Sequence, residues 1–215
     1  MKLNENLLMD SVKNAKNTTY LTHNFHPFPA KFIPHLPQIL IKEFSKPGDM
    51  VFDPFCGSGT TLVEAILLNR QSIGTDINPI SILASKVKST PLNPSEINNI
   101  RKYLLFLENV DLDTDFSQSI PEFHGRDHWF MEHVQNELAM LRTTIKEHTK
   151  AKSNARFFLD LAFSSIVNVV SNQDSDTRYA AIEKDIPIGQ PTSLLIKRAN
   201  SMLQRMEDFV NKIQN

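Results

Sequence analysis

The chain has 215 residues, of which 40% are hydrophobic, and its 23 basic and 24 acidic side chains leave a formal net charge of −1 at pH 7. This length can bury a core as one domain, or as one domain with an appended helical part. The near-zero net charge excludes a global electrostatic attraction to nucleic acid or to a membrane, so any such contact has to be local or made through a partner.

The sequence carries no signal for export or membrane insertion. Its first residues lack the apolar core of a signal peptide, and the longest apolar-rich run, residues 157–170, is interrupted by Asp160 and is too short to span a bilayer. The single cysteine, Cys56, excludes an intramolecular disulfide framework and is typical of a reducing cytosol. We therefore expect a soluble, cytoplasmic protein without a membrane partner.

Residues 1–46 form a first segment that is rich in asparagine, histidine and proline. Four prolines between positions 27 and 37 oppose regular structure until residues 36–44, which are predicted to form a short helix. We expect the segment to pack on the rest of the chain, either as a proline-rich lead-in to the core or in direct contact with a ligand.

Residues 47–92 read as strand, glycine loop, helix, strand and helix. The predicted strands are residues 50–53 and 72–76, and the predicted helices are residues 60–69 and 80–88. Strands and helices that alternate in this way form a βαβ unit with a parallel sheet and a right-handed crossover. An α/β fold is therefore expected, with an incomplete sheet, because no convincing third or fourth strand follows Thr90.

Residues 93–215 are predicted to be largely helical, with polar breaks at residues 121–127 and 171–177. Arg178 lies in a polar stretch that we expect to be exposed, where it either contacts a phosphate or belongs to a solvated turn. From Ser193 onward, apolar residues recur at helical spacing, at Leu195, Ala199, Met202, Met206, Phe209 and Ile213. That stripe either closes the chain's own core or forms an interface with a partner.

The loop between the first predicted strand and the next helix, Asp-Pro-Phe-Cys-Gly-Ser-Gly at residues 53–59, is the main candidate binding site. Gly57 and Gly59 allow backbone N–H groups and the N-terminus of the helix to approach a negatively charged group. Asp76 ends the second predicted strand about twenty residues later, where a carboxylate can accept both hydroxyl groups of a ribose. Together these features favour a ligand that contains adenosine.

Departures from other nucleotide motifs favour S-adenosyl-L-methionine. The third glycine of a dinucleotide-binding loop would fall at Leu62, and the lysine of a phosphate-binding loop is absent. A zwitterionic methionine end needs a helix N-terminus for its carboxylate and a nearby carboxylate for its ammonium group, and this loop offers both. Three simpler interpretations stay open: an ordinary turn at the glycines, Asp76 as a cap for the next helix, and Cys56 as a packing residue.

Three segments together resemble the amino-methylating DNA methyltransferases, which modify adenine N6 or cytosine N4. They are Phe-His-Pro-Phe-Pro-Ala-Lys-Phe-Ile-Pro at residues 25–34, Asp-Pro-Phe-Cys-Gly-Ser-Gly-Thr-Thr at residues 53–61, and Gly-Thr-Asp-Ile-Asn-Pro at residues 74–79. Shorter similarities at residues 127–130, 156–158 and 175–179 extend the resemblance to nearly the whole chain. It implies a Rossmann-like, S-adenosylmethionine-dependent methyltransferase fold and an enzyme of DNA methylation in restriction-modification systems.

The resemblance also implies a role for each segment. Residues 28–32 would pack on the methionine end of the cofactor, the glycine loop would lie beneath it, and Asp76 would bind the ribose. The residues that the resemblance assigns to the cofactor are Phe28, Ala30, Lys31, Phe32, Asp53, Pro54, Phe55, Cys56, Gly57, Ser58, Gly59, Thr60, Thr61, Asp76 and Ile77.

No catalytic residue is assigned, because the catalytic motif of the family is missing. Methylation of an exocyclic amine requires a flipped base held by a side-chain oxygen and a backbone carbonyl, with an aromatic ring stacked on its face. The family provides these groups with Asp, Asn or Ser followed by Pro-Pro and an aromatic residue, whereas no two prolines are adjacent in this sequence. A cytosine-C5 mechanism needs a Pro-Cys nucleophile, and Cys56 already belongs to the glycine loop. No metal is expected, because a sulfonium group leaves without one.

Three explanations remain for a cofactor site without a catalytic motif. The leading one is a split methyltransferase, in which a second subunit brings the catalytic motif and most contacts to double-stranded DNA, so that the active enzyme is a hetero-oligomer. A fragment of a longer enzyme would look the same. The second explanation is a non-catalytic cofactor-binding or interaction subunit. The third is an RNA or small-molecule methyltransferase, against which the upstream His-Pro segment argues.

Overall fold

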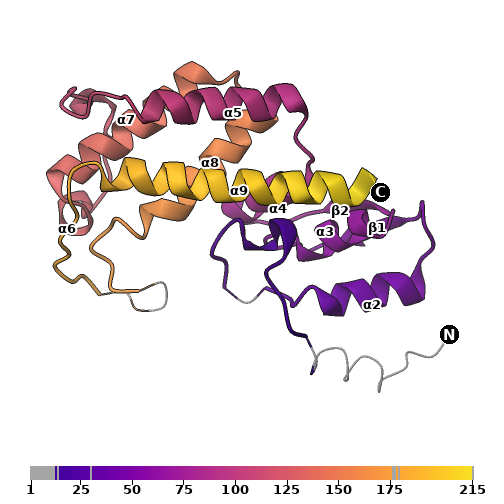
Figure 1. Ribbon diagram of the computed structural model, residues 1–215. Coiled ribbons are helices and arrows are strands. Elements are labelled where there is room, and N and C mark those ends of the chain that lie inside the picture. Colours follow the sequence, from indigo (N-terminus) through magenta and orange to yellow (C-terminus); the bar gives the residue numbers. More distant parts are fainter. Residues whose placement is uncertain (1–12, 14, 30, 176–177, 179, 215) are drawn as a thin grey trace. The chain divides into compact units, whose positions relative to one another are not determined.

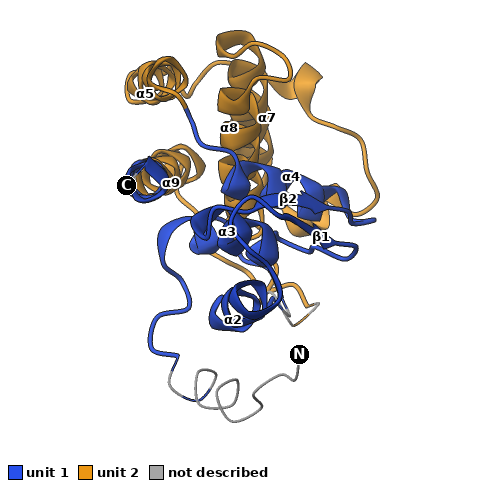
Figure 2. Ribbon diagram, turned by 90° about the vertical axis from the view of Figure 1, so that its right-hand side faces the viewer, with its two compact units in different colours: residues 1–92, 204–215 blue, residues 93–203 orange. Residues whose placement is uncertain are grey.

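The computed structural model describes residues 13, 15–29, 31–175, 178 and 180–214 (Figure 1). The chain divides into two compact units, coloured in Figure 2, and each is described by itself. Unit 1 comprises residues 1–92 and 204–215, and unit 2 comprises residues 93–203. The division groups residues 204–215 with the βαβ region and not with the other residues of the helical region.

Unit 1 contains the predicted βαβ unit. Its elements are the 3₁₀ helix η1 (Leu21–Asn24), α2 (His35–Phe44), β1 (Met50–Asp53), α3 (Thr60–Leu67), β2 (Gln71–Gly74) and α4 (Pro79–Ser89). The two strands pair in parallel, with Met50 opposite Gln71 and Asp53 opposite Gly74. Figure 1 shows them side by side, and α3, which connects them, packs against both. The α/β fold is therefore confirmed, with a two-stranded sheet in the described part of the chain.

Two predicted boundaries in this unit are wrong by two residues, and the other predicted ends of its strands and helices lie within one residue of the observed ones. The second strand ends at Gly74 and not at Asp76, because the carboxylate of Asp76 accepts the backbone N–H of Asn78 and turns the chain toward α4. Helix α3 ends at Leu67 and not at Asn69. Asn69 has a left-handed backbone with a φ of 60°, which cannot continue a right-handed helix.

The two faces of the sheet differ in how well they are covered. On one face, a Cβ at Gly74 would lie 2.7 Å from the Cβ of Cys56 and 2.9 Å from a methyl carbon of Leu62, so only glycine fits beneath α3 and the loop before it. On the other face, Phe52 is 60% exposed and its parallel neighbour Ile73 is 51% exposed. The sheet is therefore packed on one side and open on the other.

Unit 2 is helical, as predicted. Its elements are α5 (Pro94–Leu107), the 3₁₀ helix η2 (Ser117–Ser119), α6 (Arg126–Trp129), α7 (Glu132–His148), α8 (Asn154–Val167) and the first part of α9 (Gln190–Gln214). Helix α6 begins inside the polar break expected at residues 121–127, so that break is shorter than predicted. The second break contains an isolated antiparallel bridge between Gln173 and Ala181.

Buried polar contacts organise the helices of unit 2. The Tyr103 hydroxyl of α5 lies 3.0 Å from the hydroxyl of Thr144 on α7. The carboxylate of Glu137, also on α7, accepts the backbone N–H groups of Gly189 at 3.0 Å and Thr192 at 2.8 Å. These N–H groups lie at the start of α9, where a helix has donors without internal partners, so Glu137 caps that helix through tertiary structure.

The apolar stripe of α9 is buried in the chain itself. Leu195, Ala199, Met206 and Phe209 have no exposed surface, and Met202 is 1% exposed. Of the two interpretations of this stripe, the structure therefore favours the one in which the helix closes the chain's own core, and not the one in which the stripe is free for a partner. None of the described helices combines the length and the apolar character needed to cross a membrane.

Candidate functional site

The glycine loop leaves β1 at Asp53 and enters α3 at Thr60, as predicted. Asp53 stabilises the start of the loop, because its carboxylate accepts the backbone N–H of Phe55 at 3.1 Å. Gly59 has a φ of 84°, and a Cβ there would lie 2.7 Å from the Cα of Ser85 on α4. Glycine is therefore required at this position by backbone conformation and by the close approach of α4.

Gly59 is also the N-cap of α3, and no side chain hydrogen-bonds to the first turn of that helix as a cap. Most helices place a Ser, Thr, Asp or Asn at this position to satisfy one of the free N–H groups. Because α3 does not, its first turn offers donors at the positive end of a helix dipole. An anionic group placed against the loop would find them there.

The structure brings Asp76 to the glycine loop. One carboxylate oxygen accepts the backbone N–H of Gly57 at 2.9 Å, and the other accepts that of Asn78 at 2.8 Å. The hydrogen bond from Asn78, with that from Gly57, lowers the pKa of Asp76 below its usual value. Asp76 therefore lies at the predicted site and also shapes the turn into α4, whose N-cap is Asn78. The interpretation of Asp76 as the helix cap is therefore wrong, because Asn78 caps α4, and ribose binding by Asp76 stays a prediction.

The N-terminal segment reaches the same loop through Phe28. A ring carbon of Phe28 lies 3.7 Å from the position that a Cβ of Gly57 would occupy. The ammonium group of Lys31 donates to the carbonyl oxygen of His23 at 3.4 Å. Phe32 is 58% exposed and lines a groove beside α2 with Thr61. Ala30, which the sequence also assigns to the site, lies outside the described residues.

Glu64 fastens this N-terminal segment to the core. It is fully buried on α3, and its carboxylate accepts hydrogen bonds from the Tyr20 hydroxyl at 2.5 Å and from Gln38 of α2 at 3.1 Å. His23 Nε2 lies 2.8 Å from the same carboxylate. Sequence reasoning missed Glu64, although a charged residue inside the apolar run Leu-Val-Glu-Ala is a signal, because such a residue is buried only with partners.

Burial lowers the pKa of His23 below its usual value, against the opposing effect of Glu64. A neutral imidazole carries one proton, which Nε2 donates to the Glu64 carboxylate. Its Nδ1 atom is buried and has no hydrogen-bond partner among the described residues. His23 is therefore a structural donor to Glu64 of α3.

A second buried group that the sequence did not reveal is Lys88 of α4. Its side chain is 1% exposed, and its ammonium group donates to the hydroxyl of Ser58 in the glycine loop at 3.2 Å. Within the described residues this is its only side-chain partner, and no carboxylate faces it. Burial, with the charge of Lys31 nearby, lowers the pKa of Lys88 to about 7. Lys88 thus supports the glycine loop through the hydroxyl of Ser58.

The remaining predicted site residues divide by exposure. Ser58 and Thr60 are buried in the loop, whereas Phe55 is 86% exposed and Ile77 is completely exposed. Cys56 is 6% exposed and packs under Gly74, and burial raises the pKa of its thiol. Cys56 is therefore a packing residue, whereas Pro54, like Phe55 and Ile77, has an exposed side chain that can contact a ligand.

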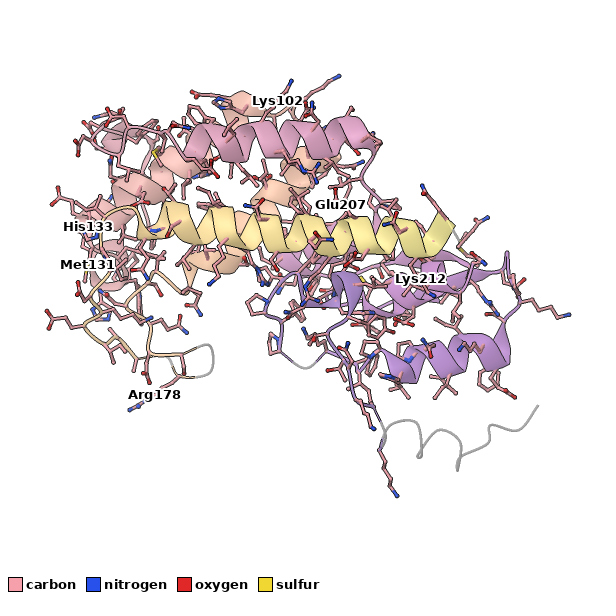
Figure 3. The ribbon with its side chains drawn as sticks, viewed as in Figure 1. Lys102, Met131, His133, Arg178, Glu207 and Lys212 are labelled. Atoms are coloured by element: carbon pink, nitrogen blue, oxygen red, sulfur yellow. The ribbon has the colours of Figure 1, made fainter. Side chains whose placement is uncertain are left out.

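Outside the loop region, the structure gives Arg178 a local partner. Its guanidinium lies 3.3 Å from the carboxylate of Asp174, and Figure 3 shows the side chain projecting outward from its loop. Ser171, at the start of this polar stretch, is buried, so the stretch is less exposed than predicted. A phosphate contact of Arg178 stays a prediction.

Comparisons with known proteins agree with these features. A family model described as DNA methylase, for the N6 and N4 group, matches residues 5–86. The type II methyltransferase M.MvaI of Kocuria varians is 31% identical over 229 aligned residues, which cover 100% of this chain and 49% of that protein. The type II methyltransferase M.MjaII of Methanocaldococcus jannaschii is 38% identical over 50% of this chain and 20% of its own length. The chain thus spans about half the length, or less, of these relatives.

A shorter similarity involves an RNA-modifying protein. The tRNA (guanine(10)-N2)-dimethyltransferase of Methanocaldococcus jannaschii is 41% identical over 64 residues, which cover 29% of this chain and 18% of that protein. No solved structure matches the chain.

Proposed function

Because this chain belongs to the family of amino-methylating DNA methyltransferases, we propose that it is the S-adenosylmethionine-binding part of an enzyme that methylates adenine N6 or cytosine N4 in DNA. The observation that carries the proposal is the convergence of Phe28, the glycine loop and Asp76. The Gly57 N–H donates to the Asp76 carboxylate, and a ring carbon of Phe28 lies 3.7 Å from the position that a Cβ of Gly57 would occupy, so three segments far apart in the sequence meet at Gly57.

The residues at the loop fit the parts of the cofactor. The uncapped N-terminus of α3 suits the carboxylate of the methionine end, and the ring of Phe28 near Gly57 suits packing against that end. The carboxylate of Asp76 suits the two ribose hydroxyl groups, and the exposed side chains of Phe55 and Ile77 suit the faces of an adenine ring. When bound, the cofactor supplies a methyl group on a sulfonium. We infer that the βαβ unit is part of a Rossmann-like sheet.

We further propose that the catalytic motif and most DNA contacts come from a second subunit, in a cytoplasmic hetero-oligomer. Three observations support this. The sequence has no adjacent prolines, the described part of the chain has a two-stranded sheet, and the chain matches 49% of M.MvaI. The net charge of −1 also agrees with a division in which the other polypeptide provides most of the basic side chains that neutralise DNA phosphates.

Methyl transfer to DNA tests this proposal. The purified chain should transfer no label from radioactive S-adenosylmethionine to unmethylated double-stranded DNA. After co-expression with a polypeptide made from the part of M.MvaI that this chain does not match, labelled adenine N6 or cytosine N4 should appear. Transfer by the chain alone would refute the division of labour, and a co-expressed pair that binds DNA without transfer would refute the catalytic proposal.

A second candidate is an RNA methyltransferase part, which the similarity to the tRNA dimethyltransferase favours. The two candidates differ in acceptor and not in cofactor. Offering the co-expressed pair an equal mixture of transfer RNA and double-stranded DNA separates them. Label in the RNA alone would mean that RNA, and not DNA, is the substrate. A pair that forms but binds no S-adenosylmethionine would favour the non-catalytic interaction subunit.

A further inference from the structure

The outer edge of β1 is open in the described part of the chain. Parallel strands use alternate residues for their two neighbours. The carbonyl groups of Asp49 and Asp53 accept hydrogen bonds from Gln71 and Thr75 on the β2 side. The backbone groups of Met50 and Phe52, which lie between these residues, therefore point to the outer edge, where no described strand pairs with them.

The side chains of β1 are those of an internal strand. Met50, Val51 and Phe52 place apolar groups on both faces, which is typical of parallel strands covered on both sides. Yet Met50 is 52% exposed and Phe52 is 60% exposed. An exposed apolar strand edge is a template for pairing with another chain.

An apolar groove of about 350 Å³ runs beside β1, between this strand and α2. Leu40 and Phe44 of α2 line one side, and Met50 and Val51 line the other. Phe44 is 54% exposed, and no charged side chain lines the groove. An added strand at the outer edge of β1 would have apolar side chains of α2 to pack against.

Met50 belongs both to the groove and to the open face of the sheet. Met50 lines the groove and shares a strand face with Phe52, whose parallel neighbour is Ile73. We call the five exposed residues Phe32, Phe44, Met50, Phe52 and Ile73 the β1 surface. A contiguous patch of large, exposed apolar side chains is typical of an interaction site.

We propose that the β1 surface is where the second methyltransferase polypeptide docks, adding a strand along the outer edge of β1 and packing apolar side chains in the groove and over Phe52 and Ile73. This inference rests on the proposed function. We choose this occupant because about half of M.MvaI lies outside the match with this chain and because a sheet with two described strands lacks the strands that would bury β1.

The position of the surface gives the docking a role in catalysis. A strand parallel to β1 would end at the same edge of the sheet as Asp53, where the glycine loop begins. The loop that follows such a strand would lie beside the methyl donor. A second copy of this chain does not meet this need, because it carries no adjacent prolines and because edges related by a two-fold axis pair antiparallel.

Co-expression with the unmatched part of M.MvaI tests the docking site. Phe44→Asp and Ile73→Asp each place a charge on the β1 surface, at residues outside the cofactor site. The control is Leu105→Asp on α5, because Leu105 is 61% exposed in unit 2. Binding should weaken on the order of tenfold or more in both surface variants and stay unchanged in the control. All three variants should keep the melting temperature and cofactor affinity of the parent chain.

Several results would overturn the proposal. They are the absence of a complex with the parent chain, a complex of equal affinity with Phe44→Asp and Ile73→Asp, and self-association of the parent chain that both variants abolish. The last would make a second copy the occupant. A complex that depends on the β1 surface but transfers no methyl group would leave the docking site standing and refute the proposed function.

Discussion

Helix α8 of unit 2 and strand β1 of unit 1 are both rich in apolar residues, but only the helix buries them. Phe158, Leu159 and Leu161 of α8 have no exposed surface. In β1, Met50 and Phe52 are more than half exposed. Burial of apolar surface is the main stabilising contribution to folding. The apolar residues of α8 make that contribution within unit 2, whereas Met50 and Phe52 of β1 remain largely exposed to solvent.

The largest effect on stability is expected from a substitution in α8, compared with a similar substitution in β1. Phe158→Ala should lower the free energy of unfolding by about 4 kcal/mol, because it leaves a cavity in the core of unit 2. Phe52→Ala removes a similar side chain that is 60% exposed, and should change stability by less than about 1 kcal/mol. Urea denaturation followed by circular dichroism measures both. Equal losses would mean that β1 is already packed within this chain.

Unit 1 does have one strongly fixed region, around Glu64. Glu64→Ala removes the acceptor of Tyr20, His23 and Gln38 and should lower the free energy of unfolding by about 3 kcal/mol, since buried donors lose their partner. Glu43→Ala, at an exposed position of α2, is the control. Proteolysis should cut the segment before α2 faster in the Glu64 variant only. An unchanged melting temperature would show that this contact does not hold the segment.

Lys88 makes the stability of unit 1 depend on pH. Its folded pKa of about 7 lies below the ordinary 10.5, so between these values the unfolded chain binds more protons than the folded one. The free energy of unfolding should therefore rise with pH from about 7 to 10.5, by up to about 1.4 kcal/mol per pH unit, and this gain is lost as the pH falls from 10.5 to 7, below which the contribution of Lys88 is constant.

Lys88→Met tests the cause of that dependence. The methionine variant should lose the rise above pH 7, whereas Lys86→Met, at an exposed position of the same helix, should keep it. Thermal unfolding at a series of pH values measures both. A rise that persists in Lys88→Met would assign the dependence to another group.

The smallest effect concerns the exposed side of the cofactor site. Ile77 is completely exposed, so Ile77→Ser should leave stability unchanged. Loss of apolar contact with an adenine ring should weaken S-adenosylmethionine binding by roughly fivefold, or about 1 kcal/mol. The same substitution at Ile188, 66% exposed in unit 2, is the control. Equal affinity in both variants would remove Ile77 from the site.

Local patterns predicted much of unit 1. The hydrophobic run that ends at Asp53 fixed β1, and the alternation of strand, loop and helix predicted the parallel pairing. The meeting of Gly57 and Asp76 followed from that topology, because the carboxyl ends of parallel strands lie at one edge. The end of β2 was misplaced because Asp76 turns the chain with its own side chain, which hydrophobic periodicity does not register.

The buried polar groups could not be placed from the sequence. Glu64 meets a partner 44 residues away in Tyr20, and Lys88 meets Ser58 across 30 residues. Helical spacing tells which face a residue occupies but not which side chain lies opposite it. The cap that Glu137 provides to α9, across more than 50 residues, was not predicted from the sequence for the same reason.

The central claim is that this chain binds S-adenosylmethionine without its partner. Isothermal titration of the purified chain with S-adenosylmethionine, in parallel with Asp76→Ala, tests it most directly. We expect one binding site per chain and, for Asp76→Ala, affinity weakened on the order of tenfold or more with an unchanged melting temperature. No heat of binding, or equal affinity for both proteins, would contradict it.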